Sequence, residues 1–196
     1  MSVLDQTHKL QVKLFLDRPL AAGVEPFIGV FHDWVKHHKL PELLIDVANY
    51  AHVPKGPGVA LIGNDGDYFI DETDGRPGLL YSRKREPPPP AERLRDAFRR
   101  TLNAALLLEK EQSVAPLHFR TDEFLFRIND RLAAPSTEAT FTALRPALES
   151  FSTELFAAPA QLALTSTPKQ LFAVKITPPA TTDLHTLLTR LGGPLT

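Results

Sequence analysis

The sequence predicts an α+β protein: a tandem repeat of two ferredoxin-like β-α-β-β-α units, with antiparallel sheets and helices on one face. Two observations predict this fold. Segments that alternate between apolar and polar residues and segments with helical spacing follow one another in the same order in both halves of the chain. A short match also recurs, because residues 17–22 (DRPLAA) and 130–134 (DRLAA) each follow the first predicted strand of their half.

The first half opens on a strand in which Leu10, Val12, Leu14 and Leu16 point to one face. Apolar residues then recur at helical spacing, and the Asn-Asp-Gly sequence at 64–66 is typical of a tight turn between two strands. The predicted elements are a strand over 9–17, a helix over 24–38, strands over 43–53, 59–62, 67–71 and 79–84, the four-proline connector 87–90, and a helix over 91–111.

The second half repeats this order in fewer residues. Ser136 or Thr137 is expected to cap its first helix, and Pro146 inside that helix predicts a kink. Thr182 or Asp183 is expected to cap the last helix. The predicted elements are a strand over 124–128, a helix over 136–156, strands over 161–165 and 171–177, and a helix over 183–191.

The repeat divides the chain into residues 1–112, which include the proline connector and its following helix, and residues 113–196. Each unit lays its helices on one sheet face and leaves the other face open. An open face has to be covered, so we expect the two units to pack as one structural unit. We also expect the open face to be the functional surface.

Bulk composition excludes several classes of protein. The 196 residues carry 22 basic and 23 acidic side chains, a net charge of −1, which disfavours nucleic-acid binding. The absence of cysteine excludes disulfides, thiolate nucleophiles and cysteine-ligated zinc. The first residues show no signal-peptide pattern, and no run of about 18 apolar residues occurs. A cytoplasmic protein that does not enter the membrane is therefore expected.

A set of polar side chains is predicted to share the open face. If Leu43, Ile45 and Val47 face the helices, strand alternation places Asp46, Tyr50 and His52 on the opposite face. An acid, a phenol and an imidazole on one face suit general acid–base catalysis, and these three are the candidate catalytic residues. The alternative is a polar interface or a solvated sheet surface. Candidate ligand-binding residues on the same face are Lys13, Phe15, Asp67 and Asp71.

The loop at 52–58 (HVPKGPG) adds Lys55 as a ligand-binding candidate, since glycines permit close backbone approach and a lysine attracts anions. The loop lacks the P-loop spacing, and a plain hairpin connection is the alternative. The five acids between Asp65 and Asp74 lack the EF-hand spacing and are assigned to turns and solvation. His38 falls on the apolar stripe of its helix and is expected in the core. No metal site and no cofactor are predicted.

Seven basic residues between positions 83 and 100 form the densest positive segment of the chain. Arg83, Arg95 and Arg99 are the candidate anion-binding residues. Glu86, Glu92 and Asp96 lie among the basic residues, so a solvated helix face with helical ion pairs is the alternative. The aromatic residues that stack bases in single-strand binders are missing from this segment.

The segment 52–63 (HVPKGPGVALIG), followed by 75–84 (GRPGLLYSRK), resembles a family of uncharacterised bacterial proteins. That resemblance implies no activity. At the level of architecture, a tandem ferredoxin-like chain is similar to the dimeric α+β-barrel proteins, which build ligand or cofactor cavities against the open sheet face.

No GxSxG, HExxH or GxGxxG motif occurs, so the sequence favours a cytoplasmic binding or assembly protein that uses its open sheet face. The partner would be a second copy in a homodimer, another protein or a small molecule. One alternative is a small-molecule enzyme of the α+β-barrel type, with His52 as acid–base residue or cofactor ligand. A weaker alternative is nucleic-acid or anion binding through residues 83–100.

Overall fold

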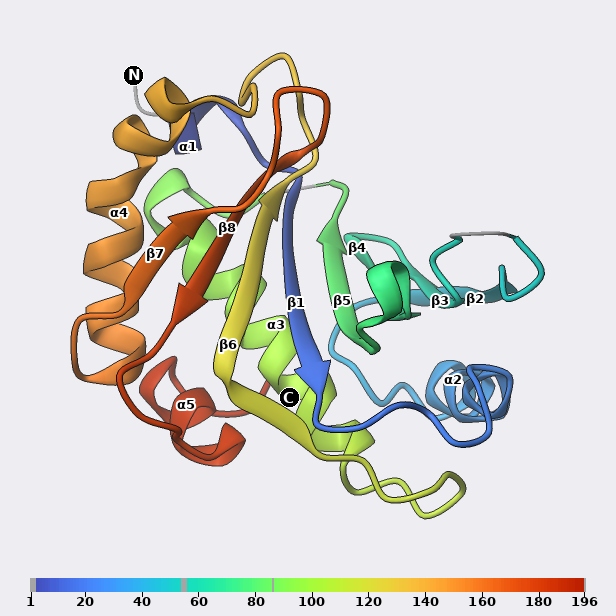
Figure 1. Cartoon of the computed structure of the whole chain (residues 1–196). Helices are drawn as coiled ribbons and strands as arrows, with labels where there is room; N and C mark the ends of the chain where they lie inside the picture. Colours follow the sequence, from blue (N-terminus) through green and yellow to red (C-terminus); the bar gives the residue numbers. More distant parts are fainter. Residues whose placement is uncertain (1–2, 54–55, 86, 196) are drawn as a thin grey trace.

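The computed structural model describes residues 3–53, 56–85 and 87–195 and places eight strands in one open antiparallel sheet (Figure 1). The strand order is β2-β3-β4-β5-β1-β6-β8-β7. The α+β class predicted from the sequence is confirmed. The strands are β1 (Leu10–Leu16), β2 (Leu44–Asn49), β3 (Val59–Gly63), β4 (Gly66–Asp71), β5 (Gly78–Arg83), β6 (Phe119–Ile128), β7 (Gln161–Leu164) and β8 (Phe172–Thr177).

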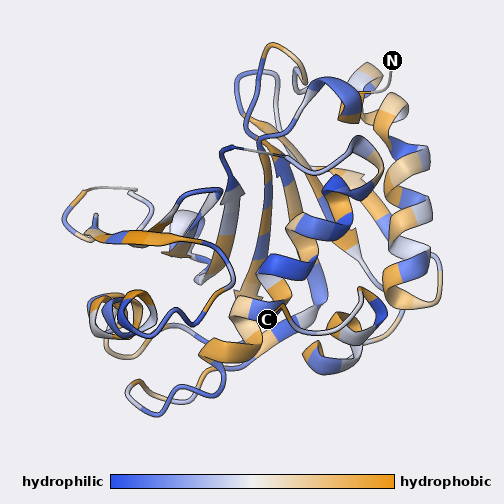
Figure 2. Ribbon diagram, turned by 180° about the vertical axis from the view of Figure 1, so that it is seen from behind, coloured by the Kyte–Doolittle hydropathy of each residue, from blue (hydrophilic) through white to orange (hydrophobic). Residues whose placement is uncertain are grey.

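Helices α3, α4 and α5 lie together behind the sheet in Figure 1 and in front of it in Figure 2, so they cover one face. Helix α2 packs against β2 and β3, at the other end of the sheet from α4. The helices are α1 (Val3–Gln6), α2 (Pro26–Lys36), α3 (Arg93–Leu108), α4 (Glu138–Phe156) and α5 (Leu184–Arg190), with short 3-10 turns η1 (Thr73–Gly75) and η2 (Pro90–Glu92).

The hydrophobic core lies on the helix-covered face. Val12, Tyr81, Tyr68 and Leu61 stand opposite one another across four strands, and all four are fully buried. Because residues directly opposite in a sheet share a face, this row fixes which face every neighbouring residue occupies. The apolar stripes of α3 and α4 supply the other side of the core, and both helices alternate between hydrophobic and hydrophilic stretches in Figure 2.

Two helices begin at the expected capping residues. The Thr137 hydroxyl accepts a hydrogen bond from the Thr140 amide at 3.2 Å, and the Asp183 carboxylate accepts one from the Thr186 amide at 2.8 Å. Helix α2 ends at Lys36, and His38 beyond it is exposed with φ of 49°. The expectation that His38 belongs to the core is therefore wrong, because the helix ends before the apolar stripe reaches it.

The edge strand β2 departs from the predicted alternation. A β-bulge between Leu44 and Asp46 shifts the register, so Leu44 is the residue buried in the core, whereas Leu43 and Ile45 are 63% and 55% exposed. The prediction that Leu43 and Ile45 face the helices is thus wrong. The bulge does not move Asp46, which pairs with Ile62 and stays on the open face.

A buried polar cluster joins the segment before β2 to α3. The fully buried Glu42 carboxylate accepts hydrogen bonds from the Tyr68 hydroxyl at 2.6 Å, the Arg100 guanidinium at 2.8 Å and the Gly66 amide at 3.2 Å. Burial, together with the Glu42 charge, raises the pKa of Tyr68 well above its ordinary value, so this phenol stays a donor. Arg100 also pairs with Asp96 at 3.0 Å. The cluster therefore ties β4 and the segment before β2 to the helix layer.

Substituting alanine at Gly58 is expected to destabilise the fold more than the same change at Gly75. Both glycines have positive φ (72° and 68°), which costs an L-residue about 1–2 kcal/mol. A Cβ at Gly58 would also collide with the Ile70 carbonyl oxygen, whereas a Cβ at Gly75 would meet nothing within 4 Å. Urea unfolding of Gly58→Ala and Gly75→Ala compares the two positions directly. Equal losses would contradict the close packing of Gly58 against β4.

Candidate functional site

The face opposite the helices carries a buried ion pair near its centre. The Lys13 ammonium on β1 lies 2.7 Å from the Asp71 carboxylate at the end of β4, and both side chains are about 2–3% exposed. Asp71 also accepts hydrogen bonds from the amide of Thr73, at 3.0 Å, and from the Thr73 hydroxyl. The pair therefore anchors η1 to the sheet.

Burial and pairing set the charge of these two groups. Burial lowers the pKa of Lys13, and the nearby Asp71 charge offsets only part of that effect. Burial alone would raise the pKa of Asp71, but the charge and hydrogen bond of Lys13, together with the hydrogen bonds from Thr73, outweigh it and hold that pKa below its ordinary value. Asp71 is therefore ionised at neutral pH.

The depressed pKa of Asp71 predicts a specific loss of stability in acid. A carboxyl group whose pKa is lower in the folded state stabilises the fold above its unfolded pKa, and the contribution disappears as the pH falls through the folded pKa. We expect the free energy of unfolding to fall more steeply between about pH 5 and pH 2 in the native chain than in Asp71→Asn. Urea unfolding at each pH measures the slopes, and parallel curves for the two proteins would contradict the assigned pKa.

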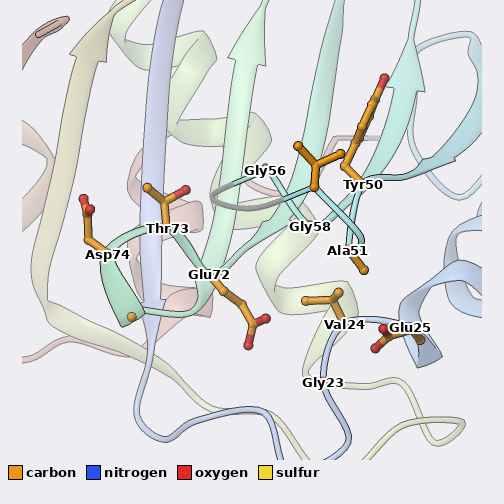
Figure 3. Close-up of a pocket in the computed structure, with 12 residues that line it drawn as sticks. Gly23, Val24, Glu25, Tyr50, Ala51, Gly56, Gly58, Glu72, Thr73 and Asp74 are labelled. Atoms are coloured by element: carbon orange, nitrogen blue, oxygen red, sulfur yellow. The ribbon is translucent and has the colours of Figure 1, made fainter.

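Two hollows flank η1 on this face. The first, which we call the β2 hollow, has a volume of about 600 Å³ and lies among residues 23–25, the segment after β2, and η1 (Figure 3). Glu25, Glu72 and Asp74 line it, and its described lining contains no lysine or arginine. Figure 3 shows the Tyr50 ring pointing away from Val24 and Glu25. The acidic side chains of this hollow and the Tyr50 hydroxyl therefore do not point toward one shared position.

The second hollow, which we call the β8 pocket, has a volume of about 470 Å³. Its lining comes from η1 and the following Arg76, from Glu123, Leu125 and Arg127 of β6, and from β8 with the 165–171 turn before it. Pockets that bind small molecules commonly have volumes in this range, with an apolar lining and a few placed polar groups. Thr73 and Asp74 line both hollows, so η1 forms the wall between them.

Arg127 is the most unusual side chain of the β8 pocket. Its Nε atom is buried and has no hydrogen-bond partner among the described residues. Burial lowers its pKa, although the charges of Asp71 and Asp74 act in the opposite direction. A buried donor without a partner costs roughly 1–3 kcal/mol, and more when it is charged. The fold therefore carries Arg127 at a cost that its own contacts do not offset.

Lys175 stands beside Arg127 on the neighbouring strand. In the register of the sheet, Lys13, Leu125 and Lys175 lie opposite one another, and Arg127 lies opposite Ala173 on β8. Within the described residues, the Lys175 ammonium makes no hydrogen bond or ion pair. Two cationic groups without carboxylate partners thus line the same pocket.

Arg76 and Glu123, two further charged residues of the β8 pocket, pair with each other. The Arg76 guanidinium lies 2.8 Å from the Glu123 carboxylate and 3.8 Å from the centre of the Phe15 ring. Lys13 also lies over that ring, at 5.4 Å. Phe15 is buried, so it forms an apolar support on which the cations stack.

The candidate catalytic residues lie away from these groups. Asp46 is exposed on β2, and Tyr50 and His52 are exposed in the segment that follows it. No hydrogen bond or ion pair joins any two of these three within the described chain, and His52 does not line the β2 hollow. Catalysis by His52 stays a prediction, and nothing in this arrangement supports it. Lys55 lies outside the described residues.

The other predicted residues have partners within the protein. Asp67 pairs with Lys84 at 2.7 Å, and Lys13 pairs with Asp71. In the basic segment, Arg83 pairs with Asp96, and Arg95 pairs with Glu154. Arg99 donates to the carbonyl oxygens of residues 192–194 at distances of 2.8–3.1 Å. The three candidate anion-binding arginines therefore already have internal partners for their guanidinium groups.

Sequence reasoning missed Arg127 and Lys175. Both lie in predicted strands, between apolar neighbours, but the sequence analysis gave neither of them a face or a role. One signal in the sequence could have drawn attention to them, because each is a charged residue inside a strand of the second half. What such a charge does depends on which strands are neighbours, and the sequence did not show that β6 pairs with β1.

Comparisons with known proteins identify no family for this chain: no family model matches it, and no curated protein is significantly similar to it. The parts of the chain that the structure describes contain no group of three or more His, Cys, Asp or Glu side chains arranged to hold a metal ion. Among the same residues, no helix is long and apolar enough to cross a membrane.

Proposed function

We propose that this chain is a non-catalytic binding protein whose open sheet face holds a small organic anion in the β8 pocket. The observation that carries the proposal is the pair of cations, Arg127 and Lys175, that line this pocket without carboxylate partners. A bound carboxylate would accept charge-assisted hydrogen bonds from the half-buried Arg127 side chain and from Lys175. Leu125 and Leu171 offer an apolar surface for the rest of such a ligand.

The strand order supports the tandem ferredoxin-like repeat, which we keep as part of the proposal. In the first half, β1 pairs with β5 and β5 with β4. In the second half, β6 pairs with β8 and β8 with β7 in the same way. The repeat would place the first strands of both units side by side at the centre, which is where Lys13 and Arg127 lie in adjacent strands.

A cytoplasmic location and a homodimer also belong to the proposal. The exposed Leu43 and Ile45 on the edge strand β2 support association, because large apolar side chains gathered at a sheet edge favour contact with another chain. Native mass spectrometry checks the assembly and shows whether a ligand of low mass is retained.

Calorimetric titration with 4-methylpentanoate and with its neutral amide tests the binding proposal. We expect the carboxylate to bind at least about tenfold more tightly than the amide, since one charge-assisted hydrogen bond contributes roughly 1.5–3 kcal/mol. Arg127→Met and Lys175→Met should each weaken carboxylate binding about tenfold or more. Lys169→Met, at an exposed lysine outside the pocket lining, is the matched control and should leave binding unchanged.

A stability measurement separates binding from folding. Because the Nε of Arg127 is buried without a partner among the described residues, Arg127→Met should keep or raise the free energy of unfolding while it weakens carboxylate binding. Equal affinity for the carboxylate and the amide, or unchanged carboxylate binding in Arg127→Met, would overturn the proposal.

A further inference from the structure

We infer that the anion held in the β8 pocket is the carboxylate of a free α-amino acid with an aliphatic side chain. This inference rests on the proposed function and narrows it to one chemical class. An amino acid presents three groups at once: a carboxylate, an ammonium and, in this class, an apolar side chain. The β8 pocket presents a counterpart to each of them.

Arg127 and Lys175 form the cationic end of the pocket. They lie on the adjacent strands β6 and β8, and neither has an ion-pair partner within the described residues. A guanidinium recognises a carboxylate through parallel N–H donors, and an ammonium beside it adds a second positive charge. This end is therefore the place for the ligand carboxylate.

Asp74 forms the anionic end. Among the described residues its carboxylate makes no hydrogen bond or ion pair with a basic side chain, and its charge only partly opposes the lowering of the Arg127 pKa by burial. Figure 3 shows this side chain turned away from Val24 and Glu25, on the side of η1 where β1 and β6 run. Because Glu123 is already paired with Arg76, Asp74 is the lining acid left to receive an ammonium group.

The apolar part of the lining and the charge balance define the rest of the ligand. Leu125 and Leu171 are half-buried, so both offer side-chain surface to the pocket. Three basic and two acidic side chains line the pocket, a net charge of +1. A phosphate or dicarboxylate dianion would meet repulsion from the acids, whereas a zwitterion finds a partner for each of its charges.

A series of three probes tests the inference by calorimetric titration: L-leucine, 4-methyl-2-oxopentanoate, which lacks the ammonium group, and L-leucinamide, which lacks the carboxylate. We expect leucine to bind at least about tenfold more tightly than either analogue. Asp74→Asn should remove the advantage of leucine over the oxo acid, and the oxo acid should bind at least as tightly as it does to the native chain. Arg127→Met should weaken both carboxylates. Glu72→Gln, at an exposed acid of the β2 hollow, is the control and should change none of these affinities.

The outcomes separate this inference from the proposed function. If the oxo acid binds as tightly as leucine and both are lost in Arg127→Met, the amino-acid assignment is overturned and the anion-binding function stands. If inorganic phosphate binds more tightly than leucine, the assignment is likewise overturned. If no carboxylate probe binds, or binding survives Arg127→Met, both the inference and the proposed function fall.

Discussion

Replacing Glu42 with alanine is expected to lower the free energy of unfolding by about 3 kcal/mol or more, because breaking a buried charge cluster leaves its other members without partners. The Tyr68 hydroxyl and the Gly66 amide would both lose their acceptor inside the protein. Arg100 would keep its ion pair with Asp96, so leaving Arg100 without Glu42 costs less stability than leaving a buried cation with no partner. Urea unfolding followed by fluorescence and circular dichroism measures the change.

A double-mutant cycle with Arg100→Met tests whether Glu42 and Arg100 act together. Residues joined by a buried ion pair show interaction energies of about 0.5–3 kcal/mol, so the double variant should lose less stability than the sum of the single variants. Glu149→Ala, at an exposed position of α4, is the control and should change stability by no more than about 0.5 kcal/mol. Strict additivity would show that the Glu42–Arg100 contact is energetically unimportant.

Replacing Lys13 with methionine is the second substitution with a large expected effect. It leaves the Asp71 carboxylate buried on the open face with only its hydrogen bonds to Thr73. Removing one partner of a buried ion pair typically costs about 3–5 kcal/mol, and the Thr73 bonds and the charge of nearby Arg127 place Lys13→Met at the lower end of that range. Chemical denaturation at pH 7 measures the loss.

The double variant Lys13→Met/Asp71→Asn shows how far the loss comes from the unpaired charge. Asparagine keeps an acceptor for Thr73 and carries no charge, so the double variant should recover part of the stability that Lys13→Met loses. A double variant that is less stable than Lys13→Met would mean that the buried carboxylate is tolerated without Lys13. The attribution of the effect to an uncompensated charge would then be wrong.

Element positions could be predicted from sequence because the dominant signals are local. Alternation at residues 10–16 and the Asn-Asp-Gly turn at 64–66 identify β1 and the β3–β4 hairpin, and both are in the structure. Thr137 and Asp183 were named as caps for the same reason. The bulge in β2 was missed because it arises from the pairing of β2 with β3. No local pattern in the residues of β2 indicates that pairing.

The candidate site was predicted only in part, because it depends on which strands are neighbours. Lys13, Phe15 and Asp71 were placed on the open face, and the structure brings these three together. Arg127 and Lys175 come from the second half of the chain, and they join the first three because β6 pairs with β1 and β8 with β6. Periodicity assigns a residue to a face, but it does not say which strands are adjacent in the sheet.

The pairing of β1 with β6 also has a consequence for biosynthesis. β1 occupies the middle of the sheet, yet its partner β6 follows roughly 100 residues later, so about 5–20 seconds of translation at 5–20 residues per second separate the two. Over that interval the apolar row of β1 has no partner on one side. We expect the nascent chain to depend on chaperone protection until residue 128 leaves the ribosome, and its refolding to be slow because its central contacts join distant segments.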